Sequence, residues 1–311
     1  MSEMIVVFDS VRKGFSKIQA LRDASFEMRR AEILGFIGPN GSGKTTAVRL
    51  MLGIYAPTQG VVRVSGRNPV NDWSTLGPQI GVSLERPGLA DYLTPLEYLE
   101  YFGGLFQMRP SVVKQRCEEL LESFGLADRA TSLLATFSKG MRQRISVARC
   151  MLNRPRLMIL DEPFDGLDVE SRRMILDSLS RLSAEEGTSV FVTSHNLGDV
   201  EEISDRVAVI RQGRVLAIGS MEALRDLVRK RRMLVVGLGK RYLREEIAHW
   251  MPDAEYDESN NKLLFDLDGC EGKQNQLLMR VLQAGISVES ANAEVPTLED
   301  VYLALTGNTE A

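Results

Sequence analysis

The stretch of sequence that decides the fold reads Gly38-Pro39-Asn40-Gly41-Ser42-Gly43-Lys44-Thr45. It fits the pattern G-x-x-x-x-G-K-[ST] at every fixed position. The apolar run at residues 33–37 predicts a buried strand before it, and residues 46–52 predict a helix after it. In that context the backbone N–H groups of the loop and the positive end of the helix point at one place. The stretch therefore predicts a loop that wraps the phosphates of a nucleotide.

The last residues of this loop have distinct expected roles. Lys44 would reach the β- and γ-phosphates, and the Thr45 hydroxyl would ligate Mg²⁺. Thr46 begins the expected helix, so its N–H belongs to the positive helix end that faces the phosphates. The alternative is a plain glycine turn before a helix, and the motifs further along the chain argue against it.

Composition and charge exclude several classes of protein. The chain has 311 residues, 44% hydrophobic and 26% charged, which is ordinary for a globular protein of one large and one small domain or two medium ones. Its net charge of −4 gives no global reason to expect nucleic acid as a partner. No apolar run approaches the roughly 18–20 residues that cross a bilayer, and the acidic start is unlike a signal peptide. The three cysteines, Cys117, Cys150 and Cys270, are widely spaced, so we expect a reducing cytoplasm and neither a disulfide framework nor a zinc site.

Short β-segments flank the phosphate loop. Residues 5–8, 24–28 and 61–64 are expected to form an antiparallel sheet. Residues from about 87 to 149 are expected to be mostly helical, because apolar residues recur there at helical spacing. Strands and helices then alternate, which predicts a mostly parallel sheet with helices on both faces. The expected elements are strands at 157–160 and 189–193, helices at 171–182 and 197–203, and a hairpin at 207–210 and 215–218.

The pattern restarts after the helix expected at 221–228 and the basic run at 229–232. That run is read as a solvated linker, with contact to anionic lipid as the alternative. A small α+β unit is expected beyond it. Its expected elements are strands at 233–236, 263–265 and 286–288 and helices at 242–250, 274–284 and 298–305.

A second nucleotide element follows the strand expected at 157–160. Asp161 and Glu162 place a carboxylate pair at the end of a buried strand, the edge at which a bound phosphate would lie. Asp161 would hold Mg²⁺ directly or through water, and Glu162 would act as general base toward the attacking water. The alternative is a solvated acidic turn.

A third element precedes the carboxylate pair. Ser138 and Gly140 lie where a short loop opens into a helix, which makes another anion site from a hydroxyl and free N–H groups. One nucleotide needs one phosphate cradle. A second cradle therefore predicts a head-to-tail dimer with two ATP molecules at the interface.

The order and spacing of these motifs resemble the ATP-binding subunits of ABC transporters over about residues 4–225. Residues 137–141 match the signature loop of that family, Asp161 and Glu162 its Walker B pair, and residues 166–168 its D-loop. Residues 296–302 are similar, more weakly, to the small C-terminal domain of ATPases that drive drug, antibiotic or polysaccharide-type exporters. The resemblance implies an α/β fold: a P-loop NTPase core with an antiparallel β subdomain and a helical subdomain at about 87–149. It places the ATPase domain at 1–225 and a small α+β domain at 226–311.

The resemblance also implies roles for further residues. His195 ends a buried strand and matches the switch histidine, which would contact the γ-phosphate and orient the water and Glu162. Asp168 belongs to the D-loop. Phe15 occupies the position where the family stacks an aromatic ring on adenine, with a core role as the alternative.

The sequence departs from the family at two places. The family ends one strand with Gln, but here Glu85 follows the matching strand at 80–84, and Gln79 lies at the wrong end of it. A carboxylate is a good ligand for Mg²⁺, so Glu85 is counted as a metal ligand, although its charge opposes ATP binding. In the signature loop, Met141 replaces the usual Gln and Lys139 replaces a small residue. Exporter-type members of the family often look like this.

These features predict the ATP-hydrolysing motor subunit of an ABC transporter, using ATP and Mg²⁺. The expected partners are a separate transmembrane permease, contacted near residues 87–106, and a second ATP-binding subunit, taken as a copy of this chain with a heterodimer left open. The protein would lie in the cytoplasm on the inner face of the cell membrane, and export is favoured. The alternative is a soluble ABC-type ATPase acting on ribosomes or DNA. A third possibility, a catalytically dead regulator, conflicts with the intact Lys44, Asp161, Glu162 and His195.

Overall fold

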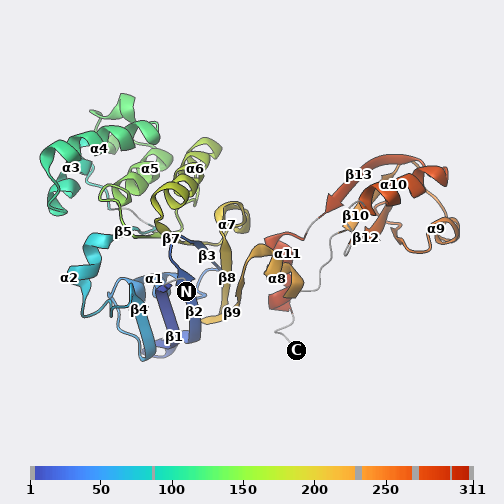
Figure 1. The fold of residues 1–311 in the computed structure, drawn as a ribbon, viewed down its shortest axis with the longest axis horizontal. Helices are drawn as coiled ribbons and strands as arrows, with labels where there is room; N and C mark the ends of the chain where they lie inside the picture. The colour runs from blue at the N-terminus through green and yellow to red at the C-terminus, as the bar shows by residue number, and fades with distance from the viewer. Residues whose placement is uncertain (1–3, 86–87, 228–232, 268–272, 295, 308–311) are drawn as a thin grey trace. The chain divides into compact units, whose positions relative to one another are not determined.

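The computed structural model describes residues 4–85, 88–227, 233–267, 273–294 and 296–307 (Figure 1). The chain divides into two compact units, residues 1–221 and 222–311. The basic run at 229–232 lies outside the described residues. Within the described part of the chain, no helix is both long and apolar enough to cross a membrane.

The larger unit is built around a six-stranded sheet with the strand order β5-β6-β7-β3-β8-β9. Neighbouring strands are parallel except for β8 and β9, which form an antiparallel hairpin. This confirms the predicted α/β fold and its mostly parallel sheet. The strands are β3 (Ile33–Ile37), β5 (Ile80–Ser83), β6 (Leu157–Asp161), β7 (Ser189–Ser194), β8 (Arg206–Arg211) and β9 (Arg214–Gly219).

The two faces of this sheet carry different cores, because successive side chains of a strand point to opposite faces. On β6, Met158 and Leu160 pack into a core with the helical segments, while Leu157 and Ile159 pack into the core of the antiparallel strands. All residues of β3, β6 and β7 are buried. The apolar residues of the central strands therefore follow one another rather than alternating with polar ones, as expected for strands covered on both faces.

The antiparallel sheet has the order β2-β1-β4, with β1 at Met4–Phe15, β2 at Ile18–Arg29 and β4 at Gln59–Val64. It confirms the sheet expected at 5–8, 24–28 and 61–64. The strands are longer than predicted because β1 and β2 pair as a hairpin from Met4 opposite Arg29 to Phe15 opposite Ile18. Helix α1 (Lys44–Met51) follows the glycine loop, two residues earlier than predicted.

The segment predicted to be helical contains α3, α4 and α5, and α3 begins with a capping box between Thr94 and Glu97 and with Pro95 at its first position. In Figure 1 these helices and α6 lie together at one side of the large sheet. The bounds are α2 (Trp73–Leu76), α3 (Pro95–Leu105), α4 (Pro110–Ser123), α5 (Lys139–Cys150), α6 (Val169–Glu186) and α7 (Leu197–Ile203), with 3-10 turns at Gly77–Gln79, Ala127–Arg129 and Leu134–Thr136.

The smaller unit has a four-stranded antiparallel sheet of order β11-β12-β10-β13 and the succession βαββαβ. This arrangement is the ferredoxin-like split βαβ motif. Its own apolar core includes Leu234, Val236, Leu263 and Phe265. The elements are α8 (Met221–Leu227), β10 (Met233–Leu238), α9 (Arg244–Trp250), β11 (Glu255–Asp257), β12 (Lys262–Asp266), α10 (Lys273–Gln283), β13 (Val288–Glu294) and α11 (Leu298–Gly307).

Two expectations for this unit need correction, and one strand was missed. The helix expected from 242 begins at Arg244, because the Leu243 N–H donates to Glu246 Oε2 at 2.9 Å and caps the helix there. The strand expected at 286–288 runs from Val288 to Glu294. Ser287, just before it, donates its N–H to the Tyr242 hydroxyl and not to a neighbouring strand. The three-residue strand β11 was not predicted, since so short a segment carries no periodic signal.

Candidate active site

A cavity of about 610 Å³ lies at the carboxyl ends of β3, β5, β6 and β7. In open parallel sheets this edge is where ligands bind. The sequence predicted most of its lining, and the structure brings those segments together from distant parts of the chain. The lining residues are Ile18, Gln19, Ala20, Pro39, Asn40, Gly41, Gly43, Lys44, Thr45, Thr46, Glu85, Glu162, Asp165 and His195.

The glycines of the loop are required by close packing and by backbone conformation. A Cβ on Gly38 would lie 2.2 Å from the Ile210 carbonyl oxygen, so no side chain fits there. Gly43 has φ +113°, and a Cβ there would lie 2.8 Å from the Ala20 carbonyl oxygen. Gly41 has φ +79°, in the left-handed region that favours glycine. The conformation and the packing of the loop therefore both require glycine.

Lys44 is buried, and its ammonium is held inside the site. Its Nζ donates to the Gly38 carbonyl at 2.6 Å and lies 3.1 Å from Glu162 Oε1. Ser42 Oγ, in the same loop, is buried and has no hydrogen-bond partner among the described residues. A buried hydroxyl without a partner is unfavourable, so the loop offers a donor that a bound oxyanion would satisfy.

Asp161 ends β6 as a buried carboxylate, and Thr193 at the end of β7 holds it. The Thr193 hydroxyl donates to Asp161 Oδ1 at 2.6 Å. Burial raises the pKa of Asp161, while the Thr193 and Thr45 hydroxyls lower it and the charges of Glu162 and Glu85 raise it. By distance and angle, Asp161 Oδ2 makes no hydrogen bond within the described residues, although the Thr45 hydroxyl is close enough to affect the pKa.

The surroundings of Asp161 Oδ2 show whether the residues of the site fit a magnesium ion. A buried carboxylate oxygen without a partner, beside a hydroxyl and a second carboxylate, is the kind of oxygen donor set that Mg²⁺ prefers, completed by substrate phosphates and water. Within the described residues there is no group of three or more His, Cys, Asp or Glu side chains arranged as a metal cage. The donor set therefore fits an ion that is held jointly with a bound phosphate.

Glu162 and His195 are in direct contact within the site. His195 donates its backbone N–H to Glu162 Oε2 at 3.1 Å, and His195 Nδ1 lies 2.8 Å from the same oxygen. Glu162 has φ +50°, a conformation that costs a non-glycine residue about 1–2 kcal/mol. Its N–H donates to the carbonyl oxygen and the hydroxyl of Thr193, which offsets that cost. Strain of this kind is found where a side chain must be aimed.

Ser138, Gly140 and Asp168 form a separate group that does not line this cavity. Ser138 caps α5, with Oγ accepting from Met141 N–H at 3.2 Å, and Asp168 caps α6, with Oδ1 accepting from Ser171 N–H at 2.8 Å. The hydrogen bonds from Ser171 lower the pKa of Asp168. A Cβ on Gly140 would lie 2.5 Å from Ser171 Oγ, so the starts of α5 and α6 are packed directly together.

Of two further expected ligand residues, one lines the cavity and the other does not. Phe15 does not line it: the ring is partly exposed and packs edge-on against Tyr55 at 5.0 Å between centroids. Glu85 does line it, two residues after the end of β5. Gln79 lies before β5, and its Nε2 donates to the Thr75 carbonyl at 2.8 Å, well away from the lining.

Sequence reasoning missed five residues of the site. Ile18, Gln19 and Ala20 enter because the hairpin of β1 and β2 reaches the glycine loop. Thr193 was seen only as part of a strand, yet a polar residue at the end of a buried strand was a usable signal. Asp165 was passed over between two recognised motifs.

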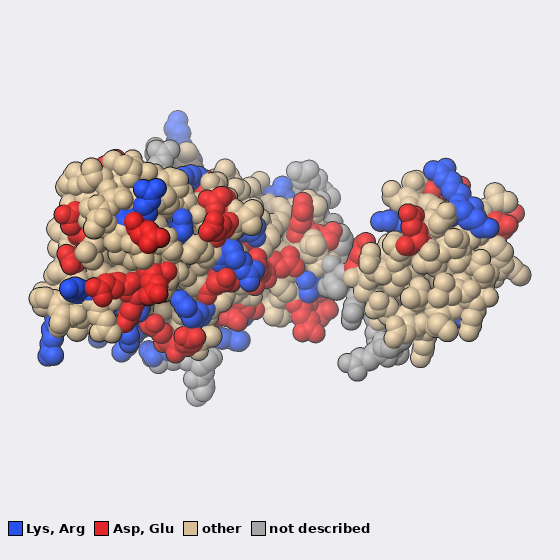
Figure 2. All heavy atoms as spheres, turned by 90° about the horizontal axis from the view of Figure 1, so that it is seen from above, with Lys and Arg blue, Asp and Glu red and all other residues tan. Residues whose placement is uncertain are grey.

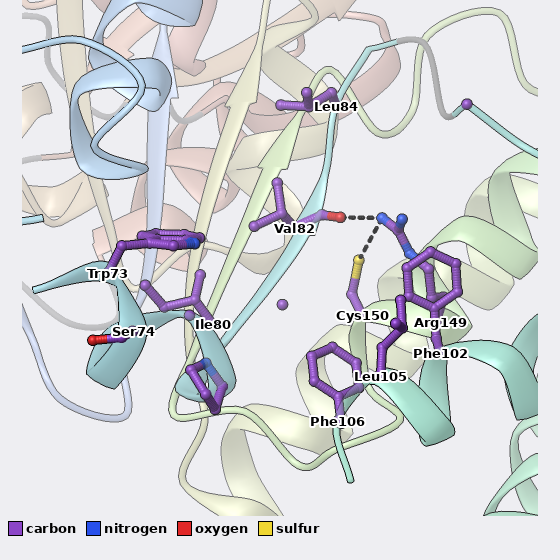
Figure 3. Close-up of a pocket in the computed structure, with 14 residues that line it drawn as sticks. Trp73, Ser74, Ile80, Val82, Leu84, Phe102, Leu105, Phe106, Arg149 and Cys150 are labelled. Atoms are coloured by element: carbon purple, nitrogen blue, oxygen red, sulfur yellow. Dashed lines mark hydrogen bonds between the residues drawn. The ribbon is translucent and has the colours of Figure 1, made fainter. Parts of the chain in front are cut away.

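A second cavity, of about 520 Å³, is formed by β5 with α2, α3 and α5 (Figure 3). We call it the β5 groove. Figure 3 shows Trp73 and Ile80 on one side and the aromatic rings of Phe102 and Phe106 on the other. Its lining residues are Trp73, Ser74, Gly77, Pro78, Ile80, Gly81, Val82, Leu84, Gly88, Phe102, Leu105, Phe106, Arg149 and Cys150.

Arg149 ties the elements of the β5 groove together. β5 is an edge strand, and Arg149 donates to the carbonyl oxygen of Val82 on that strand. The guanidinium lies over the Phe102 ring of α3, 4.9 Å from its centroid. One side chain of α5 thus bridges α3 and β5.

The site and the fold can be compared with known proteins. A sequence profile of the family described as ABC transporter matches residues 21–165. The chain is 31% identical over 311 residues to the daunorubicin resistance ATP-binding protein DrrA3 of Streptomyces coeruleorubidus, which covers 99% of this chain and 98% of the relative. It is 30% identical over 306 residues to the bacitracin transport ATP-binding protein BcrA of Enterococcus faecalis, which covers 98% of this chain and 97% of the relative.

A solved structure is similar as well. It is a dimeric ATP-binding cassette in a post-hydrolysis state, bound to ADP and Pi, with a TM-score of 0.63 and 25% identity, covering 70% of this chain and 98% of that one. The sequence relatives align over nearly their whole length, and the glycine loop, Glu162 and His195 line one cavity. The chain therefore belongs to the family of ABC transporter ATP-binding proteins and is an ATP-hydrolysing subunit of that family.

Proposed function

We propose that two copies of this chain clamp two ATP molecules between them and drive a separate membrane permease from the inner face of the cell membrane. One observation carries the proposal: the chain presents two phosphate-type sites with separate linings. Neither Ser138 nor Gly140 lines the cavity at Lys44, so each site would be completed by the other copy. A dimeric relative bound to ADP and Pi supports this arrangement.

Within each site, this chain's residues would divide the work of hydrolysis. The loop 38–46 binds the phosphates, with Lys44 leaving Glu162 for the β- and γ-phosphates. Glu162 then accepts the proton of the attacking water, and His195 orients the water and contacts the γ-phosphate. Thr45, Asp161 and Glu85 would hold Mg²⁺, which offsets phosphate charge when bound.

The remaining contacts would position the nucleotide. Ser138 and Gly140 would bind the γ-phosphate of the partner's ATP, with Asp168 bracing the start of α5 through Ser171. Phe15 would stack on adenine from the tip of the hairpin whose other arm, Ile18–Ala20, lines the cavity. Stacking tolerates any purine, so discrimination against GTP would be weak.

The β5 groove is the proposed permease contact. It overlaps the helical region expected for that role, and Trp73, Leu84 and Leu105 are large apolar side chains left exposed there. Exposed apolar patches of this kind mark interaction sites. On the face of the larger unit that Figure 2 shows, basic side chains lie between groups of acidic ones, a surface that favours a protein partner over nucleic acid. The names of the two relatives, daunorubicin resistance and bacitracin transport, favour export.

Affinity purification from membranes tests the proposal. The tagged chain should recover a polytopic membrane protein, and Leu105→Asp should lose it while still binding ATP, because the change places a charge in the β5 groove. Leu133→Asp is the matched control, since Leu133 is comparably exposed but outside the groove. Recovery of ribosomal proteins or DNA in place of a membrane protein would overturn the permease assignment. If the preparation contained a second, different ATP-binding subunit, the proposed homodimer would be wrong and a heterodimer would take its place.

A further inference from the structure

The cavity at Lys44, proposed above as the ATP site and called the nucleotide cavity from here on, is lined by more negative than positive charge. Its described lining residues include three carboxylates, those of Glu85, Glu162 and Asp165. Among the same residues, Lys44 is the one lysine or arginine. Lys44 is already paired with Glu162 at 3.1 Å. A triphosphate entering such a cavity meets repulsion unless other cations offset it.

One such cation stands just behind the lining. Lys139 Nζ lies 3.0 Å from Asp165 Oδ2, and Asp165 Oδ1 lies 3.9 Å from His195 Nε2. The lysine reaches Asp165 by crossing Gly166, where a Cβ would lie 2.4 Å from Nζ. Gly166 has φ +62°, so glycine is favoured there for its backbone conformation as well. The absence of a side chain at Gly166 thus leaves room for the Lys139 ammonium group.

We propose that Lys139 is a positioning residue of its own chain's nucleotide site: by neutralising Asp165, it allows an acid-lined cavity to accept ATP. This rests on the proposed function, which makes the cavity the ATP site. Lys139 belongs to the loop assigned to the partner's nucleotide, yet its ammonium faces Asp165 of its own chain. When the phosphates take Lys44, Lys139 remains as the cation that keeps Asp165 neutralised.

The proposal has a specific signature in a double-mutant cycle. Lys139→Ala should raise the Kd for ATP about three- to fivefold, since both side chains are half exposed and solvent screens the effect. Asp165→Asn combined with Lys139→Ala should restore wild-type affinity, because no charge is left to neutralise. Lys139→Arg should bind like wild type. In steady state, Lys139→Ala should raise KM for ATP with kcat little changed, and added salt should shrink the difference.

The measurement is ATP titration at protein concentrations where light scattering shows monomer, with thermal melting to confirm folding. Arg173→Ala is the matched control, because its pair with Asp177 is also exposed, at 3.0 Å, but lies away from the cavity. The proposal is overturned if Lys139→Ala binds ATP like wild type, or if Asp165→Asn fails to rescue it, which would show that Lys139 does not act through Asp165. Lys44→Ala separates the two hypotheses: wild-type affinity in that variant would show that the cavity is not the ATP site.

Discussion

The nucleotide cavity and the β5 groove adjoin at the end of β5, and their lining residues differ in chemical character. Leu84 lines the groove and Glu85, the next residue, lines the cavity. The cavity is built from glycines, hydroxyls and charges, and the groove mainly from aromatic and aliphatic side chains. Phosphate binding, as proposed for the cavity, allows few residue types at fixed spacing, so the cavity leaves a sequence motif. An apolar surface can be assembled from many residues, so the groove leaves none.

The largest predicted effect lies in the cavity. Glu162→Gln should lower the rate of ATP hydrolysis about 10²- to 10⁴-fold, because an amide cannot accept the proton of the attacking water. ATP binding should persist, which a phosphate-release assay together with nucleotide titration would check. Glu170→Gln is the control, since Glu170 is an exposed carboxylate on α6. A wild-type rate in Glu162→Gln would remove this residue from the role of general base.

A smaller effect is predicted for the groove, and on a different quantity. Arg149→Leu should lower the free energy of unfolding by about 1.5–3 kcal/mol, because the outward carbonyl of Val82 on the edge strand loses its charged donor. Intrinsic ATP affinity should change little, since Arg149 does not line the nucleotide cavity. Denaturant unfolding and ATP titration give the two values, with the exposed Arg129→Leu as control. A lost ATP affinity with unchanged stability would contradict the division between the two regions.

The smallest effect is predicted where the regions meet. Glu85→Gln should retain ATPase activity and shift the Mg²⁺ concentration needed for half-maximal rate by a few fold, because a neutral carbonyl replaces a charged ligand. The same change removes a negative charge from the cavity, so ATP affinity without metal should rise. Titration of rate against Mg²⁺ checks this, and abolished activity would show that the carboxylate itself is needed.

Much of the fold followed from local pattern, and the exceptions have physical causes. The buried strands β3, β6 and β7 were predicted because apolar runs bounded by polar residues identify them. The length of the β1–β2 hairpin was not, because its outer residues are held by cross-strand pairing rather than by their own burial pattern. The residues Ile18 to Ala20 entered the cavity for the same reason.

By itself, the sequence determined the glycine loop, the carboxylate pair and the family of ATPases. These depend on backbone conformation and chemistry within a few consecutive residues, as at Gly43 and Glu162. The tertiary structure decided which distant segments share a cavity. It placed Glu85 on the same edge as Lys44, paired Lys139 with Asp165 and set Arg149 against β5. Those contacts arise from the order of strands in a sheet and from helix packing, which no short stretch of sequence encodes.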